Sequence, residues 1–405
     1  MHSSKAQQVS GARPEGTRIW WSNAVFFVCV HMAAFMGVYY RPPWLVKPAS
    51  LVLGFLVWQL ADFGITIGYH RLYSHKAFRA TTGVRIMLAM LGSVAFQGSI
   101  KWWCLRHRLH HRYTDDPIHD PYAATRGLLY SHMGWIFFKR NYERLSLIEK
   151  DDLERDPVVQ FQHKYYVFLA LILGFAMPPL LGLLWNDPLG SFIWAGLVSR
   201  LFIWHCTFLV NSLAHKNGLQ PYSDEDSSRG NLILALLTGG EGNHNFHHSF
   251  PNDFRSGPFK LDWDPSKWII LALYRMGLVS GLRTAREVDI VDCLLYTQKK
   301  RDSIDAATER WEGVIWDHAQ LRRYHQENPL NCILLLDGFV LDVTQYIREH
   351  PGGSALLKNY SFSIDKTRGF KGVQWEFHGG FNNHSRTAKK RAREMRIAKL
   401  DGTCI

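Results

Sequence analysis

The chain has 405 residues, which is enough for two or three domains, and it carries a formal net charge of +12. This charge indicates an anionic partner, but long apolar runs before Val210 place the protein in a bilayer and argue against nucleic acid. The six cysteines are scattered without CxxC pairs, so we expect neither a zinc site nor a disulfide framework.

The first 18 residues are polar, contain Gly, Pro and Ser, and lack the pattern of a secretory signal, so we interpret them as a flexible tail. Four apolar segments follow that match the roughly 20 residues needed to cross a hydrocarbon core of about 30 Å. They are Ile19–Tyr40, Ala49–Gly68, Tyr165–Leu184 and Ser191–Val210. A fifth apolar stretch, Ile86–Ile100, is too short to span and is expected to form a buried or interfacial helix.

Short loops join the spans in pairs, at residues 41–44 and again at residues 186–188. The spans therefore form two helical hairpins, and the rest of the chain must lie on one side of the membrane. Basic residues gather on that side, in the N-terminal tail and between Arg71 and Arg144, which makes it cytosolic by the positive-inside rule.

The fourth span contains two polar residues, Arg200 and His205, whose placement in hydrocarbon is costly. Such residues can mark a functional path through the membrane. We favour an internal pairing instead, with Asp62 of the second span as the candidate partner.

Histidines are abundant, and their placement matters more than their number. Nine of them gather in the segments HRLYSH, HRLHH, NSLAHKNG and NHNFHH, all on the side assigned to the cytosol: His70, His75, His107, His110, His111, His215, His244, His247 and His248. Two of these segments have histidines at positions i, i+3 and i+4, which share one helix face, so we expect each triplet to point toward one position. The five-residue spacing of His70 and His75 points them in different directions and suits two metals rather than one.

Neutral imidazoles suit iron, copper, zinc or nickel. Four or five nitrogens per metal exceed the three protein ligands that are usual for catalytic zinc, so a pair of redox-active irons is the better interpretation. Nearby carboxylates are candidates to accept the second ring N–H of the ligands, namely those of Asp115, Asp116, Asp120 and Glu241. The histidines without a comparable setting are treated as structural: His2, His31, His119, His132, His163, His318, His325 and His378.

The segments HRLYSH, HRLHHRYTDDPIHDPY, NSLAHKNG and EGNHNFHHSFPNDFR together resemble the membrane acyl-CoA Δ9-desaturases, the stearoyl-CoA desaturase family, in order, spacing and intervening residues. The resemblance covers Ile19–Gly281 and implies an all-α membrane domain of four transmembrane helices with a cytosolic helical cap, residues 19–283. It implies that the nine histidines bind two non-haem irons and that Asn211 reaches one of them through water.

The family reaction inserts a cis double bond between carbons 9 and 10 of a saturated acyl-CoA, using O2 and two electrons from cytochrome b5. An unactivated methylene has neither an acidic proton nor a leaving group, so oxygen activation at a metal is the chemistry that can begin this reaction. The resemblance further implies a multi-pass protein of the endoplasmic reticulum membrane, with both termini and the active site in the cytosol.

Four residues match family positions that contact the substrate. By that match Trp103 shapes the bend of the acyl chain, Trp58 closes the tunnel and helps to set chain length, and the pair Lys139 and Arg140 contacts coenzyme A, the anionic partner that the net charge indicates. Ordinary roles stay open for each of them: interfacial packing for Trp103, core packing for Trp58, and a cytosolic flank for the basic pair.

The polar C-terminal part divides into a charged helical linker, residues 284–328, and a compact module, residues 329–405. In the module, DGFVLDV alternates in the manner of a strand and is followed by EHPGG and HSRTA, which together resemble cytochrome b5, a small α+β haem domain. The resemblance implies that His350 and His384 bind haem b, with His378 as the competitor for the second position because the intervening stretch is longer than usual. Such iron has no open site and transfers electrons, and the resemblance implies that an NADH-linked cytochrome b5 reductase supplies them.

Two other classes of protein share parts of this pattern. A fatty acid or sphingolipid hydroxylase has similar histidine clusters, and analysis of the product separates oxygen insertion from the loss of two hydrogens. A non-catalytic membrane haem carrier would hold haem without non-haem iron, and metal analysis separates it from a desaturase.

Overall fold

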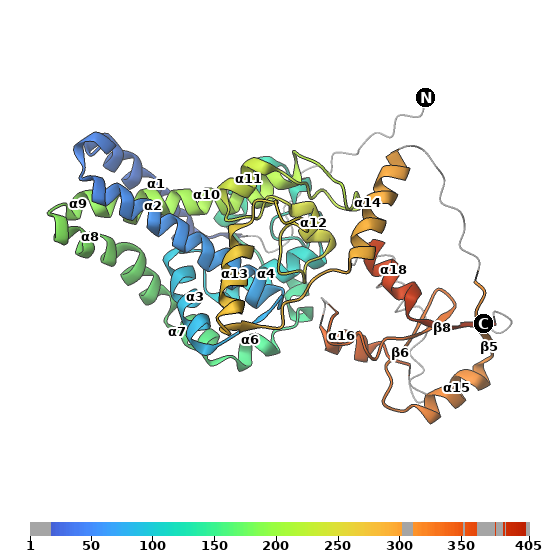
Figure 1. Cartoon of the computed structure of the whole chain (residues 1–405). Coiled ribbons are helices and arrows are strands. Elements are labelled where there is room, and N and C mark those ends of the chain that lie inside the picture. The colour runs from blue at the N-terminus through green and yellow to red at the C-terminus, as the bar shows by residue number, and fades with distance from the viewer. Residues whose placement is uncertain are drawn as a thin grey trace.

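The computed structural model describes residues 18–301, 311–350, 353–362, 377, 384 and 386–401. The molecule is elongated, with apolar helices at one end and a small domain of C-terminal residues at the other (Figure 1). Four helical segments are long and apolar enough to cross a membrane, which confirms the four predicted spans. They run over Trp21–Tyr40, Pro48–Ser74, Pro157–Trp185 and Pro188–His215.

The spans form the two expected hairpins, whose loops lie together at the far left of Figure 1. The first hairpin consists of α1 (Trp21–Tyr40), α2 (Pro48–Phe63) and the π-helix η2 (Gly64–Ser74). The second consists of α7 (Pro157–Leu171), η6 (Ile172–Ala176), α8 (Met177–Gly182), η7 (Leu183–Trp185), α9 (Pro188–Ser191), η8 (Phe192–Val198), α10 (Ser199–Ser212) and η9 (Leu213–His215). Asp187 joins the hairpins, because its carboxylate accepts from the Lys47 N–H at 3.0 Å and from the Ser50 hydroxyl at 2.7 Å.

The helical cap covers the other end of the spans. Its helices are α3 (Thr82–Val94), α4 (Ile100–Arg112), α5 (Leu128–His132), α6 (Asp151–Arg155), α11 (Leu232–Leu237), α12 (His244–Ser249) and α13 (Pro265–Arg275). Two antiparallel strand pairs support it, β1 (Arg18–Ile19) with β3 (Phe138–Lys139) and β2 (Arg79–Ala80) with β4 (Val279–Ser280). The expected single helix over Ile86–Ile100 is divided between α3 and α4, because Phe96 and Gly98 both have positive φ angles.

The second span and α3 approach each other closely at two glycines. A Cβ atom on Gly64 would lie 2.3 Å from the backbone nitrogen of Gly92, and one on Gly92 would lie 2.2 Å from the Tyr69 ring. Neither gap admits a methyl group unless the α3 backbone, in the first case, or the Tyr69 ring, in the second, is displaced. The contact therefore fixes where η2, and the histidine that it carries, sit relative to the cap.

Replacing Gly64 with alanine should consequently destabilise the protein by about 1–3 kcal/mol, because overpacked contacts of this kind cost that much. Thermal unfolding of the detergent-solubilised protein measures the effect. Gly83→Ala is the matched control, since Gly83 lies on α3, the helix that Gly64 contacts, and a Cβ atom there meets nothing within 4 Å. Equal melting temperatures for the two variants would contradict this account of the contact.

The C-terminal domain is a four-stranded sheet in the order β5-β8-β7-β6, covered by short helices. Its strands are β5 (Ile315–Trp316), β6 (Ile333–Leu336), β7 (Phe339–Asp342) and β8 (Arg396–Leu400), and its helices are α15 (His318–Glu327), α16 (Ser354–Asn359) and α18 (Arg386–Glu394). The expected boundary at residue 329 is too late, because β5 pairs with β8 and Leu321 of α15 is fully buried against the sheet. The sequence did not reveal β5 because a strand of two residues is too short to show an alternation of apolar and polar residues. The expected linker over residues 284–328 is thus divided, because α14 (Glu287–Arg301) packs against the cap and the residues from Ile315 onward belong to the C-terminal domain.

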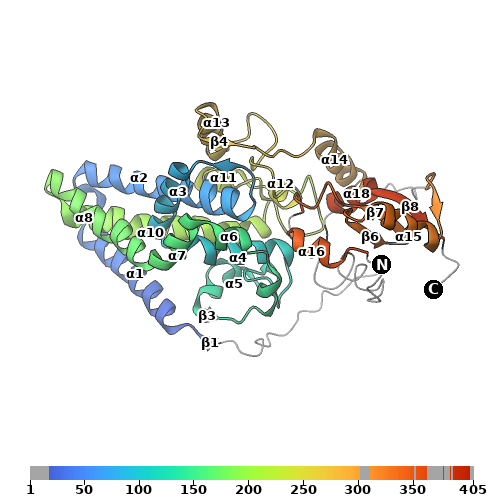
Figure 2. The ribbon, with the colours of Figure 1, turned by 90° about the horizontal axis from the view of Figure 1, so that it is seen from below.

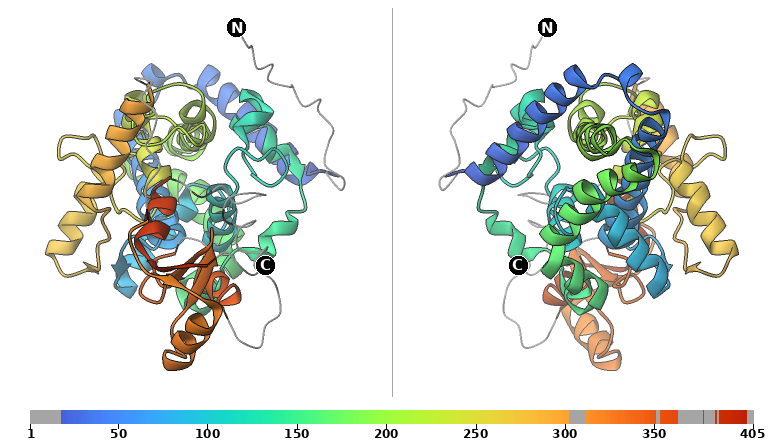
Figure 3. Two further views of the ribbon diagram at one scale, coloured as in Figure 1. Left: turned by 90° about the vertical axis from the view of Figure 1, so that its right-hand side faces the viewer. Right: turned by 90° about the vertical axis from the view of Figure 1, so that its left-hand side faces the viewer.

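Views along other directions show how the parts meet. In Figure 2 the spans extend to the left and the C-terminal sheet lies to the right, with α14 and α18 side by side between them. Figure 3 looks along the length of the molecule from each end, and the C-terminal domain lies across the cap rather than beside the spans. The C-terminal domain therefore contacts the end of the membrane domain that contains the histidine segments.

Candidate metal centre

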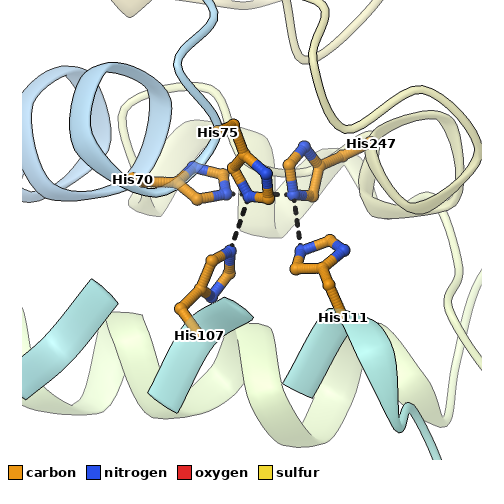
Figure 4. Close-up of side chains that lie close together, drawn as sticks. All are labelled: His70, His75, His107, His111 and His247. Atoms are coloured by element: carbon orange, nitrogen blue, oxygen red, sulfur yellow. Dashed lines mark hydrogen bonds between the residues drawn. The ribbon is translucent and has the colours of Figure 1, made fainter. Parts of the chain in front are cut away.

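The nine clustered histidines come together in two groups at the capped end of the spans. In each group the ligand atoms all lie within 4.8 Å of one another. The first group is His70, His75, His107, His111 and His247, and Figure 4 shows its rings pointing toward one another from η2, α4 and α12. The second group is His110, His215, His244 and His248. The groups adjoin, because the rings of His111 and His248 stack with centroids 4.4 Å apart.

The contacts between rings are made by their Nε2 atoms. In the first group, the Nε2 of His247 lies 3.0 Å from that of His70 and 2.9 Å from that of His111. In the second group, the Nε2 of His244 lies 3.0 Å from those of both His215 and His248. Two nitrogens at right angles around a metal, each at about 2.1 Å, are separated by roughly 3.0 Å. The spacing is that of ligands around a common ion.

The helical triplets divide between the two groups, which corrects the expectation that each triplet points to one position. His107 and His111 belong to the first group, whereas His110 belongs to the second. Successive residues of an α-helix turn by about 100°, so positions i and i+4 differ by about 40°, while i+3 lies about 100° from i+4. The triplet of α12 divides by the same rule, with His244 and His248 in the second group and His247 in the first.

His70 and His75 also differ from expectation, because both belong to the first group. The reason is the π-helix, in which the N–H of residue i+5 bonds the carbonyl of residue i. The His75 N–H indeed donates to the His70 carbonyl at 3.1 Å, so a spacing of five returns to the same face. On an α-helix these two side chains would diverge.

Neighbouring residues hold the second nitrogen of several ligands. The Nδ1 of His110 contacts Asp120 at 2.9 Å and the Nδ1 of His70 contacts Glu241 at 3.2 Å, as predicted for these carboxylates. Two further partners escaped the sequence analysis: Ser227, whose hydroxyl lies 2.8 Å from the Nδ1 of His215, and Asp226, whose carboxylate lies 3.6 Å from the Nδ1 of His248.

The remaining two predicted carboxylates act less directly. Asp115 accepts from both the N–H and the hydroxyl of Ser227, and so it supports His215 through that serine. Asp116 instead contacts His119, at 2.9 Å, and holds no member of either group. This prediction for Asp116 is wrong because its position one residue after Asp115 turns it toward the loop 117–119.

Arg71, next to His70, is a buried residue that the sequence analysis missed. Its guanidinium contacts Glu241 at 2.9 Å and Asp264 at 2.9 Å, and all three side chains are buried. Burial alone would raise the pKa of Glu241, but Arg71 and His70 outweigh it and lower that pKa to about 2. Glu241 is therefore an anion that fixes the ring of His70 and the cation beside it. A charged residue inside the otherwise histidine-rich HRLYSH segment was the available signal.

The donor set fits a pair of metal ions. Since their Nδ1 atoms are engaged, His70, His110, His215 and His248 present Nε2 lone pairs inward, and the Nε2 of His110 is buried without a hydrogen-bond partner. Burial, followed by the neighbouring rings, holds the pKa of His75, His107 and His247 well below the usual range, so these rings are neutral. Converging neutral nitrogens repel one another unless a cation lies between them.

Glu241→Gln should lower metal affinity by about 10–100-fold, which is the usual effect of removing a carboxylate behind a ligating histidine. Metal content after titration with a chelator measures this loss. Glu154→Gln is the matched control, because Glu154 forms exposed ion pairs with Lys101 and Lys150 on the cap surface. Unchanged chelator resistance in Glu241→Gln would show that Glu241 acts only on Arg71.

The expected substrate contacts lie at different depths. The Trp103 ring stacks on that of His107, with centroids 4.8 Å apart, and so forms a wall of the first group. Trp58 lies in α2 and packs against Phe202 of α10 at 5.5 Å. Lys139 is exposed on β3, whereas Arg140 is buried and donates to the Tyr130 hydroxyl at 2.9 Å and to the Ile118 carbonyl at 2.6 Å. Asn211 lies in α10, one turn before His215.

The polar residues of the fourth span do not pair with Asp62, which corrects that prediction. Arg200 donates to the Gly174 carbonyl at 2.9 Å. His205 instead links two histidines, because its Nε2 lies 3.1 Å from that of His31 and its Nδ1 lies 3.0 Å from the Nε2 of His132. The Asp62 carboxylate lies instead beside Gly239, where a Cβ atom would be only 2.6 Å from it.

His350 and His384 face each other in the C-terminal domain, with ring centroids 6.2 Å apart. The Nδ1 of His350 lies 3.3 Å from the Gly353 carbonyl, and that of His384 lies 3.2 Å from the Phe377 carbonyl. Two imidazoles on opposite sides of one metal, at about 2 Å each, have centroids roughly 6 Å apart. These two rings therefore fit the bis-histidine ligation of haem. The competitor His378 lies outside the described residues.

Four membrane-spanning helices, a double histidine group and a pair of facing histidines in a separate sheet domain define a class of metal-dependent membrane oxidoreductase. The fatty acid desaturase family model matches residues 42–256, more than half of the chain, and the cytochrome b5-like haem/steroid binding domain model matches residues 317–401. The chain belongs to the fatty acid desaturase family and ends in a cytochrome b5-like domain. We call residues 18–301 the desaturase domain and residues 311–401 the haem domain.

Named relatives agree with both matches. The chain is 36% identical to the probable acyl-CoA desaturase of Schizosaccharomyces pombe over 390 residues, which cover 94% of this chain and 79% of that protein. It is 38% identical to acyl-CoA desaturase 1 of Saccharomyces cerevisiae, over 83% of this chain and 65% of that protein. Stearoyl-CoA desaturase 5 of Homo sapiens is 36% identical, over 68% of this chain and 84% of that protein.

Proposed function

We propose that this chain is an acyl-CoA Δ9-desaturase, which converts a saturated acyl-CoA of the stearoyl or palmitoyl class into its cis-9 monoene for unsaturated fatty acid biosynthesis. The observation that carries the proposal is the pair of adjoining histidine groups, with five and four imidazoles, at the end of four apolar spans. The names of the relatives, acyl-CoA desaturases and stearoyl-CoA desaturases, support the substrate class.

The overall reaction removes two hydrogens from neighbouring methylenes and reduces O2 to two waters, and it consumes two electrons and two protons. Two irons bound by the histidine groups would supply the oxygen activation that an unactivated methylene requires. Haem b bound by His350 and His384 would supply the electrons one at a time, from an NADH-linked cytochrome b5 reductase. Asn211 would support one iron through water, from one turn before His215.

The protein's own side chains then position the substrate. Trp103, stacked on His107, is placed to hold the bend of the acyl chain beside the first group. Trp58 lies within the second span and would limit how far the chain extends. Lys139 is exposed and suited to the phosphates of coenzyme A, whereas Arg140 would act by ordering the segment around Tyr130 and Ile118.

Fatty-acid profiling of a desaturase-deficient cell that expresses the chain tests the proposal. We expect cis-9 monoenes to appear, with products two hydrogens lighter than their precursors. Hydroxylated products would instead favour a fatty acid hydroxylase, and an unchanged profile in cells with intact haem and metal content would reject catalysis. Elemental and haem analysis of the purified protein should give about two non-haem irons and one haem per chain, as the ligand sets imply.

We also propose that the protein resides in the endoplasmic reticulum membrane with its histidine groups, haem domain and both termini in the cytosol. The basic residues of the cap support this orientation by the positive-inside rule. Protease protection of sealed microsomes tests it: cleavage of a C-terminal epitope without detergent is expected, and protection of that epitope would reverse the topology.

A further inference from the structure

The haem domain and the desaturase domain meet through two neighbouring helices, α14 and α18. Helix α14 belongs to the desaturase domain, because Ile290 and Cys293 are buried in a cluster with Phe246 and Phe250 around the metal-binding helix α12. Helix α18 belongs to the haem domain, where Ala392 is buried against the sheet. Figures 1 and 2 both show the two helices side by side.

Opposite charges face each other across this contact. From the haem domain, Lys390 lies 3.4 Å from Asp292 and Lys389 lies 3.6 Å from Glu225, which are both carboxylates of the desaturase domain. A third ion pair has the charges reversed, with the cation on the desaturase domain. The guanidinium of Arg286, just before α14, lies 2.8 Å from Glu394 of α18 in the haem domain. Each of these pairs is at least partly exposed and would contribute little alone.

Asp289 lies at the centre of the contact. Its side chain is buried, and three cations surround it: Arg286 at 2.8 Å, Lys390 at 3.8 Å and Arg391 at 3.8 Å. Two of these cations come from the haem domain. A buried carboxylate needs such partners, so separation of the domains would leave Asp289 with Arg286 alone.

A second contact joins the two candidate redox sites more directly. The Asn252 side-chain amide donates to the Glu349 carbonyl at 3.0 Å. Asn252 follows the ligand His248 by four residues, and Glu349 immediately precedes the ligand His350. Close by, Gly353 has a φ angle of 87°, and a Cβ atom there would lie 2.6 Å from the carboxylate of Glu149. Only a glycine permits both that backbone conformation and that approach.

Both sites open into one space between the domains. A cavity of about 1380 Å³ is lined on one side by His111 and His248 and on the other by His350 and His384. The apolar side chains of the haem domain that line it include Leu334, Leu341 and Met395. The mouth of the haem pocket thus faces the histidine groups, with no covering segment between them among the described residues.

We propose that the haem domain is docked in cis on the histidine face of its own desaturase domain, by the cations of α18 on the carboxylates of Asp289, Asp292 and Glu225. The tether gives the two domains an effective concentration in the millimolar range, so a few weak ion pairs suffice to hold them. If the proposed desaturase function is correct, electrons pass within one chain, and a separate cytochrome b5 cannot reach the histidine face while the haem domain is docked.

Carbodiimide cross-linking of the full-length holoprotein tests the docking without reference to activity. This reagent joins amines to carboxylates that already touch, so we expect linked peptides for Lys390 with Asp292 and for Lys389 with Glu225. Chains labelled with heavy nitrogen, mixed with unlabelled chains before solubilisation, distinguish the two arrangements. Heavy–heavy and light–light pairs are expected; mixed pairs would show docking in trans, and the absence of both linked peptides would overturn the interface.

A second experiment exchanges the charges of Lys389 and Glu225. It measures the yield of the cross-link between Lys390 and Asp292, which are both left unaltered. Lys389→Glu and Glu225→Lys should each lower that yield by about fivefold, because each opposes like charges, and the double variant should restore it. Arg322→Glu is the matched control, since Arg322 is an exposed cation of the haem domain on α15, which lies away from the desaturase domain in Figures 1 and 2.

Metal content and haem absorption are measured in every variant, because Glu225 adjoins Asp226 behind His248. Both should stay at the level of the unaltered protein. Single variants that keep full cross-linking would reject the interface, as would a double variant that fails to recover. Loss of desaturation in a normally cross-linked protein would count against the proposed function alone.

Discussion

Replacing His247 with alanine should reduce desaturation to background while the haem absorption stays unchanged. The Nε2 of His247 lies 3.0 Å from that of His70 and 2.9 Å from that of His111, so this ring joins ligands from η2 and α4. Its removal leaves the first group without the residue from α12 that completes it. The haem ligands lie in a separate domain with its own core and should not respond.

Three measurements on the same preparation check this result: product formation, metal content and the haem spectrum. His119→Ala is the matched control, because His119 lies just after α4, contacts Asp116 and belongs to neither group. We expect the control to keep its activity and metal. Full activity in His247→Ala would remove His247 from the centre, and loss of haem there would contradict the independence of the domains.

Replacing His350 or His384 with alanine should have the opposite signature, with loss of haem and of NADH-driven desaturation but full retention of non-haem metal. Their facing rings, 6.2 Å apart, would otherwise share one iron, so either loss breaks bis-histidine ligation. Burial and then the neighbouring His384 lower the pKa of His350 to about 4, which keeps the ring neutral and ready to bind metal at cellular pH.

His378→Ala decides between the two candidates for the second ligand. It should keep the haem spectrum that His384→Ala loses, and the reverse result would exchange their roles. His325→Ala on α15 serves as a further control within the haem domain. Activity of His350→Ala should stay low when an external cytochrome b5 is added alone, and it should return when Lys389→Glu also weakens the docked interface.

Much of the architecture follows from the sequence, because the features concerned depend on local patterns. Hydrophobic length predicts the four spans, and short loops between them place all nine clustered histidines at one end. Asp120 and Glu241 were also predictable as partners of ligating histidines, since acidic residues close to such segments commonly take that role.

The division of ligands between the two groups was not predicted, because it depends on helix type and on small angular differences. An i, i+3, i+4 triplet shares one broad face, but about 100° separates its last two members, which is enough to send them to neighbouring metals. The membership of His75 depends on a π-helix, and no residue pattern in Gly64–Ser74 distinguishes π from α hydrogen bonding. Long-range contacts such as Arg71 with Asp264 have no local signature at all.

The π-helix also has an evolutionary consequence. An i→i+5 turn encloses one more residue than an α-turn, so loss of a single residue between Gly64 and His70 would permit ordinary α-helix, on which a spacing of five places His75 about 140° from His70 around the helix axis. His75 would then leave its group while the hydrophobic length of the span barely changed. The span would still be long and apolar enough to cross the membrane after such a deletion, but the histidines could no longer converge. We therefore expect homologues to have the same number of residues between Gly64 and Ser74 even where their loops differ in length.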